Sequence, residues 1–309
     1  MKTGIRRVHK HPITSQKVVT FTFDGKKYTA YKGDTLASAL ISHNIKVVGR
    51  SFKYHRPRGI LTIGSEEPNA LFRVGVGSRI EPNIPATQIE IFDGLVVESQ
   101  NRWPSLNFDM GSINSLFSRL IPAGFYYKTF MWPSSMWENY EWFIRRAAGL
   151  GKAAEDHNDP DRYEHIHYHC DVLIAGGGLS GLISAYILGS SGVKVLIADE
   201  KPELGGSLIY EDDIKIDGSK GTTWVKKIEQ QLNEMSNVKI LKRSCVFGYQ
   251  DHNFLTIAER CSDHLTEVSK SSIRQRLWKV RSKQVLIAQG MHERPQVISG
   301  NDIPGVMLS

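Results

Sequence analysis

The sequence predicts an α/β protein of two globular domains joined by a connector. Three observations support this fold class. An alternating segment around Asp24-Gly25 is typical of an antiparallel hairpin, and a glycine-rich turn at 176–181 lies between an apolar strand and a helix. The chain also has 309 residues, 40% of them hydrophobic, which is enough to bury two separate cores.

Composition excludes several classes of protein. Charged residues make up 23% of the chain and Pro plus Gly only 39 residues, which excludes collagen and general disorder. The three cysteines have no CxxC spacing, so we expect neither a disulfide framework nor a cysteine-ligated metal. The start, MKTGIRRVHKHP, lacks the apolar segment of a secretory signal, and a transit peptide would need a serine-rich amphipathic helix. We therefore predict a cytoplasmic protein.

Two further features bear on partners. Residues 172–193 carry no charge, but their six glycines would break a spanning helix, so we predict no membrane partner. The net charge of +7 is uneven, because residues 1–60 hold 13 Lys and Arg against two Asp. These cations are dispersed, so we predict no nucleic-acid partner and favour a solvated face or a surface for an acidic partner subunit.

Residues 1–102 are predicted to form the first domain. The segment 18–31 alternates apolar and polar residues as two strands, and 33–44 has the spacing of a short helix with an N-cap at Asp34 or Thr35. A loop rich in proline and glycine then precedes a strand at 70–76. A hairpin followed by a helix is the opening of a β-grasp domain.

Residues 103–168 are predicted to form an aromatic-rich helical connector. Twelve aromatic residues occur within 103–143, and we expect them to fill the core or the domain interface. The segment 134–151 has a serine N-cap and a glycine stop, which predict a helix, and the polar residues after it indicate a linker. His165, His167 and His169 would share one face of a strand, but no clear fourth ligand is near, so we predict no metal site.

Residues 169–309 are predicted to form a Rossmann-type dinucleotide-binding domain of the FAD/NAD(P)-binding superfamily. The apolar strand DVLIA leads directly into the turn and a helix, with a second strand at 194–198. Gly176 allows the tight turn, Gly178 allows close approach of the pyrophosphate, and Gly181 allows the helix to pack on the strand.

The second strand ends in two acids that bear on nucleotide choice. Asp199 and Glu200 lie 18 and 19 residues beyond Gly181, where an acid accepts a ribose hydroxyl. Two acids would repel a 2′-phosphate, so NADP is disfavoured, while NAD and FAD both remain open.

Both domains resemble known families. The first resembles a plant-type ferredoxin whose cluster loop has lost its cysteines, and with no cysteine in residues 1–169 we expect no iron–sulfur cluster. Residues 203–207 and 284–290 resemble flavin-dependent disulfide-reductase-like proteins, in which a second nucleotide domain would follow residue 309. We therefore expect the N-terminal portion of a longer protein, the alternative being a natural end at Ser309.

A more specific resemblance runs along the whole chain. The strings that carry it are RSFKYHRPRGI (50–60), EEPNAL (66–71), RRAAGLGKA (145–153), DPDRYE (159–164), HCDVLIAGGG (169–178), VFGYQDHNFLT (246–256) and GMHERP (290–295). In these the sequence is similar to the alpha subunit of heterotetrameric sarcosine oxidase. The resemblance implies a cysteine-less ferredoxin-like domain, an NAD-binding region and a downstream tetrahydrofolate domain outside this chain. It also implies beta, gamma and delta subunits, with FAD and FMN in the full complex.

The family's reaction is the oxidative demethylation of sarcosine to glycine, with peroxide formed and the one-carbon unit passed to tetrahydrofolate. By motif position the resemblance places NAD contacts on Ser180, Asp199, Glu200, Lys201, Ser207 and Val246, and no residue of this chain is a catalytic candidate. Related N-methylglutamate, opine or hydroxyproline dehydrogenases and cyanide-forming glycine oxidases stay open. A free-standing FAD-dependent oxidoreductase and a non-enzymatic scaffold are the alternatives from other classes.

Overall fold

The computed structural model describes residues 17–118, 124, 132–147, 149–154, 158–211, 213–269 and 271–308. The chain divides into two units, one formed by Met1–Pro160 with Glu293–Ser309 and one by Asp161–His292. The predicted domains had boundaries at 102/103 and 168/169 and gave 293–309 to the second domain. The structure therefore groups the connector and the last residues with the first unit.

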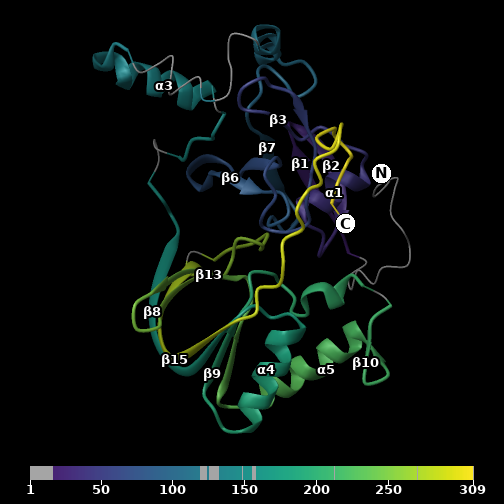
Figure 1. Cartoon of the computed structure of the whole chain (residues 1–309), viewed down its shortest axis with the longest axis vertical. Helices are drawn as coiled ribbons and strands as arrows, with labels where there is room; N and C mark the ends of the chain where they lie inside the picture. Colours follow the sequence, from purple (N-terminus) through teal and green to yellow (C-terminus); the bar gives the residue numbers. More distant parts are fainter. Residues whose placement is uncertain are drawn as a thin grey trace. The chain divides into compact units, whose positions relative to one another are not determined.

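The first unit contains a five-stranded sheet in the order β2-β1-β7-β5-β6 (Figure 1). Its strands are β1 Val18–Phe23, β2 Lys26–Tyr31, β5 Leu71–Val74, β6 Glu81–Pro85 and β7 Leu95–Ser99. The predicted hairpin is confirmed, because β1 and β2 pair antiparallel around Asp24 and Gly25, both with positive φ. Helix α1, Leu36–Ser42, is capped by Thr35, whose hydroxyl accepts from the Ser38 amide at 3.2 Å. The short pair β3 Gly49–Arg50 and β4 Pro57–Arg58 and the 3₁₀ turn η1 Gly77–Arg79 complete the unit.

The core of the first unit lies between α1 and the sheet. Phe21, Leu36 and Phe72 are at most 1% exposed, and Met307 from the end of the chain packs against the same core. The Leu308 amide donates to the Leu61 carbonyl at 2.8 Å. These contacts explain why the last residues belong to this unit and not to the predicted Rossmann domain.

The connector contains η2 Met110–Phe117, η3 Ser134–Met136 and α3 Trp137–Ala147. The prediction that its aromatic residues are buried is wrong for several of them, because Trp103, Phe108 and Trp132 are 64%, 68% and 83% exposed. The predicted serine cap is also absent, since η3 begins after Pro133 without a side-chain hydrogen bond. Four of the predicted aromatic residues lie outside the described residues, namely Phe125, Tyr126, Tyr127 and Phe130.

The second unit contains a six-stranded sheet in the order β12-β9-β8-β15-β14-β13. Its strands are β8 Arg162–Ala175, β9 Val195–Ala198, β12 Val238–Leu241, β13 Ser244–Gln250, β14 Phe254–Arg260 and β15 Ile273–Ile287. Strands β12, β9, β8 and β15 pair parallel. Strand β14 pairs antiparallel with β15, and β13 pairs antiparallel with β14. Helices α4 Leu179–Ser190 and α5 Gly221–Glu234 lie side by side on one face (Figure 1). The small elements are η4 Gly206–Ile209, β10 Lys215–Ile216 and β11 Ser219–Lys220.

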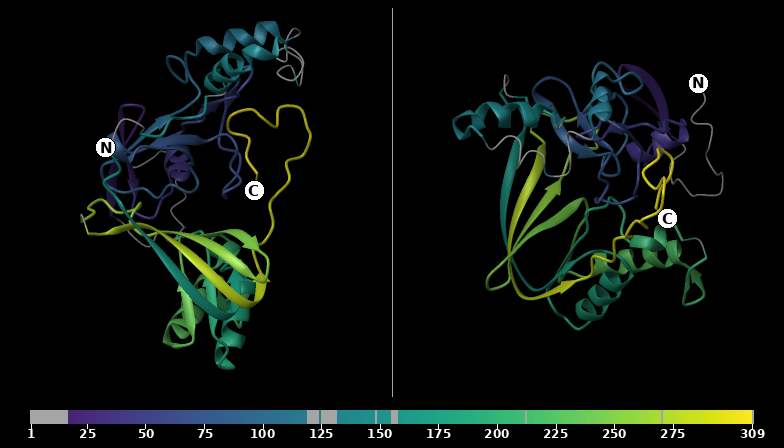
Figure 2. Two further views of the ribbon diagram at one scale, coloured as in Figure 1. Left: turned by 90° about the vertical axis from the view of Figure 1, so that its left-hand side faces the viewer. Right: turned by 45° about the horizontal axis from the view of Figure 1, so that its top comes forward.

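Strand β8 begins earlier than the sequence predicts. Residues 162–168, interpreted as part of a linker, pair with β15 along its first half, and the two long strands run together in Figure 2. Tyr168 on β8 packs edge-on against Trp278 on β15, with 5.9 Å between ring centroids. The three histidines of this strand, His165, His167 and His169, are exposed on the opposite face and contribute to the segment's linker-like composition.

Both faces of the parallel strands are buried. Ile174 and Ile197 pack beneath the two helices, whereas Leu173 and Leu196 pack with Ile257 from the antiparallel part of the sheet. This arrangement accounts for the continuous apolar runs in β8 and β9. It also holds the carboxyl ends of these two strands in fixed positions.

Candidate dinucleotide-binding site

The glycine turn joins β8 to α4 at the carboxyl end of the parallel strands. Gly176 has a φ of +109°, and a Cβ there would lie 2.2 Å from the carbonyl oxygen of Ala288. The Ala288 amide donates to the Ala175 carbonyl at 2.8 Å, which fixes this neighbour of the turn. Only glycine fits the position.

The first turn of α4 leaves backbone donors available to a ligand. Gly178 is the N-cap residue, and no side chain caps the helix. A Cβ at Gly178 would meet only the Gly206 Cα, at 3.9 Å, so the space in front of the helix is open. Ser180 is exposed on this turn. An uncapped helix N-terminus of this kind attracts a phosphate group.

Gly181 lets α4 pack directly on the turn. A Cβ at this position would lie 2.0 Å from the Gly176 carbonyl oxygen and 3.5 Å from the Ile174 side chain. Because the nearest atom belongs to the backbone, the clash cannot be relieved by rotating a side chain. The three glycines of the motif are thus brought together, and each has a different steric reason.

Asp199 ties the end of β9 to the glycine turn. Its carboxylate accepts from the Gly177 amide at 2.6 Å and from the Lys201 amide at 2.8 Å. Its backbone carbonyl accepts from the Ser244 amide at 2.7 Å, which brings the start of β13 alongside. Each carboxylate oxygen keeps a second lone-pair direction, which a ribose hydroxyl can use.

A second pair of glycines closes the other side of the turn. The Gly205 amide donates to the Gly177 carbonyl at 2.8 Å, and Gly205 also forms a parallel bridge with Gly178. A Cβ at Gly206 would lie 3.1 Å from the Gly178 Cα. Ser207 follows in η4 with its side chain exposed beside this pair. The loop after β9 therefore lies against the fingerprint itself.

The other predicted contacts lie around this centre. The Lys201 ammonium bonds to the Tyr210 hydroxyl and lies 4.9 Å from its ring centroid, while the Glu200 carbonyl accepts from the Arg260 guanidinium at 3.2 Å. Val246 lies on β13, two residues after the contact to Asp199, and packs against the core on that face. Tyr210 and Arg260 were not predicted, because neither belongs to a local motif.

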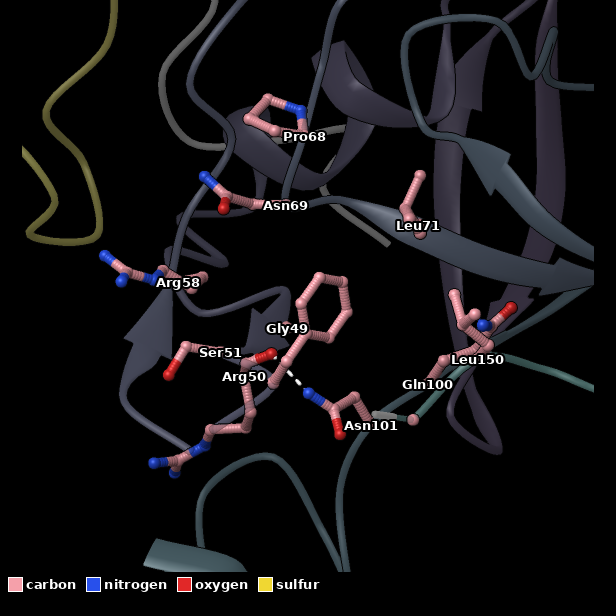
Figure 3. Close-up of a pocket in the computed structure, with 12 residues that line it drawn as sticks. Gly49, Arg50, Ser51, Arg58, Pro68, Asn69, Leu71, Gln100, Asn101 and Leu150 are labelled. Carbon is pink, nitrogen blue, oxygen red and sulfur yellow. Dashed lines mark hydrogen bonds between the residues drawn. The ribbon is translucent and has the colours of Figure 1, made fainter. Parts of the chain in front are cut away.

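Two cavities lie away from the turn. One, of about 260 Å³, belongs to the first unit and is lined by Arg50, Asn69, Asn101 and Leu150 among others (Figure 3). Polar side chains of this cavity already form hydrogen bonds with the backbone. The Asn101 side-chain amide donates to the Arg50 carbonyl at 2.6 Å, and the Asn69 side-chain amide donates to the Gly59 carbonyl at 3.2 Å. We therefore do not assign it a ligand.

The other cavity, of about 530 Å³, adjoins the loop after β9 through Arg260. Its cations include Lys242 and Arg276, which are partly neutralised by acids that also line it: Lys242 forms an ion pair with Glu229, and Arg276 lies 3.6 Å from Glu259. The paired charges reduce its net positive field, so we do not treat it as a phosphate site.

The structure also locates the features excluded on sequence grounds. His165, His167 and His169 are exposed on one face of β8. Within the described ranges, no group of three or more His, Cys, Asp or Glu is arranged to hold a metal ion. In the same part of the chain no helix combines the length and apolarity needed to cross a membrane.

Cys261, on the wall of the larger cavity, is predicted to be unreactive. Burial, followed by the nearby Glu259 carboxylate, raises the pKa of this thiol to about 11. At about pH 8.5, where an ordinary thiol is half ionised, roughly one molecule in a hundred or fewer would carry the thiolate. We expect iodoacetamide to label Cys261 far more slowly in the native chain than in urea, measured by peptide mass spectrometry. Equal rates in the two states would contradict this assignment.

Sequence comparisons support both domains. Residues 16–102 match the 2Fe-2S iron-sulfur cluster binding domain family, and residues 174–237 match the NAD(P)-binding Rossmann-like domain family. The L-proline dehydrogenase of P. horikoshii aligns with a TM-score of 0.56 and 21% identity over 94% of this chain and 44% of that one, which supports the fold. The predicted order of a ferredoxin-like domain and a Rossmann-type domain is confirmed. Together these features define a chain in which a ferredoxin-like domain is followed by an NAD(P)-binding Rossmann-like domain.

The more specific resemblance is confirmed as well. The chain is homologous to the alpha subunit of sarcosine oxidase, with 48% identity to that of Rhizobium meliloti over 98% of this chain and 31% of the relative. The corresponding alpha subunit of Corynebacterium sp. (strain U-96) is 33% identical over 96% of this chain and 26% of its own length. An opine oxidase subunit of Agrobacterium tumefaciens is 26% identical over 45% of this chain and 27% of its own length. The chain thus spans about a third, or less, of these relatives.

Proposed function

We propose that this chain is the NAD-binding N-terminal portion of the alpha subunit of a sarcosine oxidase complex. The observation that carries the proposal is the Asp199 carboxylate, held by the Gly177 and Lys201 amides at the end of β9. It lies beside the uncapped first turn of α4. The helix terminus would take the pyrophosphate, and Asp199 would accept from the adenosine ribose.

The choice of NAD rests on two arguments. Asp199 and Glu200 together oppose a 2′-phosphate, which favours NAD over NADP. The resemblance described in the sequence analysis implies an NAD-binding region, and the similarity to proteins named as sarcosine oxidase alpha subunits supports that resemblance. Of the predicted contacts, Ser180, Lys201 and Ser207 lie on the segments that border the turn. Val246 lies on β13, two residues after Ser244, whose amide donates to the Asp199 carbonyl.

We assign no catalytic residue to this chain. Near the turn, the Asp199 carboxylate accepts hydrogen bonds from backbone amides, and the Lys201 ammonium donates to the Tyr210 hydroxyl. NAD is proposed to be held without turnover and to stabilise the folded protein, because a ligand that binds only the native state shifts the unfolding equilibrium.

The chemistry belongs to the proposed complex as a whole. There, sarcosine is oxidatively demethylated to glycine with FAD and FMN, peroxide is formed, and a downstream domain passes the one-carbon unit to tetrahydrofolate. The beta, gamma and delta subunits are the proposed partners. The relatives are themselves named as alpha subunits, which supports the existence of other subunits.

Two alternatives retain specific support. The match to the opine oxidase subunit favours a related secondary-amine dehydrogenase, in which another subunit would determine the substrate. The glycine turn would also accept the pyrophosphate of FAD, which keeps a flavin-dependent oxidoreductase in consideration.

Nucleotide-dependent melting tests the proposal. The chain, freed of copurified nucleotide, is heated with NAD, NADP or FAD at equal concentrations. At about 100 times its Kd, NAD would stabilise the native state by about 2.7 kcal/mol and raise the melting temperature by several degrees. NADP should have a smaller effect and FAD none. A rise with FAD and none with NAD would overturn the proposed nucleotide.

A further inference from the structure

The first domain belongs to a cluster-binding family but has no residues that could hold the cluster. The family match covers residues 16–102, whereas the first cysteine of the chain is Cys170. Because a [2Fe–2S] cluster is held by four cysteine thiolates in ferredoxins, the residues present do not fit one. Some other interaction must hold the 59–70 loop, which lies between β4 and β5 within the matched residues.

The loop closes on the carboxylate of Glu67. This side chain is buried, with the residue 3% exposed. One oxygen accepts from the amides of Leu61 and Thr62 at 2.7 and 2.8 Å. The other accepts from the amides of Asn69 and Ala70 at 2.8 and 3.1 Å. The Thr62 hydroxyl adds a longer contact of 3.5 Å to the first oxygen.

Four converging amides form a site for an anion. A buried carboxylate is very unfavourable unless it is hydrogen-bonded, and here both oxygens receive two short bonds. Concave sets of backbone N–H groups bind phosphates and iron–sulfur clusters in other proteins, because both ligands are anionic acceptors. The 59–70 loop has such a set, and its occupant is a side chain of the loop itself.

We propose that Glu67 is an internal anion that replaces the iron–sulfur cluster as the organising centre of the 59–70 loop. The ferredoxin-like fold is thereby kept without a metal. The consequence is a rigid scaffold in place of an electron carrier. This inference concerns the first domain alone and does not depend on the proposed nucleotide.

The closed loop also supports the end of the described chain. The Leu61 carbonyl accepts from the Leu308 amide at 2.8 Å, and the Leu61 amide donates to the Glu67 carboxylate. A Cβ at Gly59 would lie 2.9 Å from the Pro304 Cα, so the segment is in direct contact with the loop. Arg58 forms an ion pair with Asp302 at 2.5 Å beside it. Residues 302–308 therefore dock on the loop that Glu67 organises.

Two substitutions separate the acceptor role of Glu67 from its shape. In Glu67→Gln, the side-chain NH₂ group replaces one carboxylate oxygen and must face two backbone N–H donors. One pair of backbone amides in the loop therefore loses its acceptor. In Glu67→Ala, the site is empty and open to a small carboxylate from solution. We expect each variant to melt at least about 5 °C below the native chain. Glu66→Gln, at the exposed neighbouring position, is the matched control and should melt like the native chain.

The decisive readout is rescue by a small carboxylate. Formate should raise the melting temperature of Glu67→Ala, whereas formamide at the same concentration and chloride at the same ionic strength should not. Formate should leave the native chain unchanged. Equal rescue by formamide, or melting of Glu67→Gln within about 1 °C of the native chain, would overturn the proposal.

Amide hydrogen exchange supplies a second test that does not require a melting transition. In Glu67→Gln we expect exchange of either the 61–62 or the 69–70 amide pair to accelerate at least about tenfold, with the β1–β2 hairpin unchanged. Unchanged exchange at both pairs would contradict the inference. If Glu67→Ala does not accumulate folded, refolding from urea with formate or formamide makes the same comparison, and failure of formate contradicts the proposal.

Discussion

Gly181→Ala should abolish nucleotide binding and destabilise the second unit. The new methyl group would lie 2.0 Å from the Gly176 carbonyl oxygen, so α4 must move away from the turn. Inserting a methyl group against backbone atoms that cannot move aside costs about 3 kcal/mol, and the displaced helix no longer presents its first-turn amides. Urea unfolding and NAD titration measure the two effects.

Gly178→Ala provides the matched control. A methyl group there meets only the Gly206 Cα at 3.9 Å, and the residue has a negative φ that alanine tolerates. We expect nearly native stability but at least about tenfold weaker NAD binding, because the methyl group occupies the space through which the pyrophosphate approaches. If Gly181→Ala retains native NAD affinity, or Gly178→Ala destabilises the fold as much as Gly181→Ala, the assignment of the two glycines is wrong.

Asp199→Asn should weaken NAD binding by about 10 to 100-fold, which corresponds to about 1.4 to 2.7 kcal/mol. Asparagine keeps one acceptor but places an NH₂ group against the Gly177 or Lys201 amide, which now donate to the carboxylate at 2.6 and 2.8 Å. The charge-assisted bond to the ribose is also lost. Calorimetric titration of each variant with NAD measures the loss.

Glu200→Gln distinguishes Asp199 from its acidic neighbour. The hydrogen bond described for Glu200 uses its backbone carbonyl, which accepts from Arg260 and is retained in the variant. We expect less than about a threefold change in NAD affinity. An effect at Glu200 as large as that at Asp199 would show that Glu200 is the main ribose acceptor instead.

Short sequence motifs were sufficient to predict one key feature of each domain, the hairpin of the first and the glycine turn of the second. Asp24-Gly25 encodes the hairpin, because both residues must adopt positive φ between two alternating strands. Gly176 and Gly181 encode the turn, because a Cβ at either would clash with backbone atoms, and Gly178 leaves the space before the helix open. These features depend on residues close together in the sequence, which is why spacing alone reveals them.

The features that sequence reasoning missed depend on distant residues. The first half of β8 is a strand because β15 pairs with it, although the two are about a hundred residues apart. The end of the chain packs on the first unit through Arg58 and Asp302, which are 244 residues apart. Tyr210, whose hydroxyl accepts from the Lys201 ammonium, belongs to no sequence motif. A single tyrosine in a loop has many possible roles, so its contact could not be predicted.

The division into units follows from the same contacts. Residues 302–308, which dock on the 59–70 loop, belong to the first unit although they follow β15 of the second unit.

The most direct test of the account is the identity of the nucleotide that the chain carries. The chain is purified without added nucleotide and denatured, and the released compound is identified by mass and absorbance. The account predicts that NAD is recovered without flavin. It also predicts that less NAD, or none, is recovered from Gly178→Ala. Recovery of stoichiometric FAD would contradict it and would make this chain part of a flavin-carrying catalytic protein.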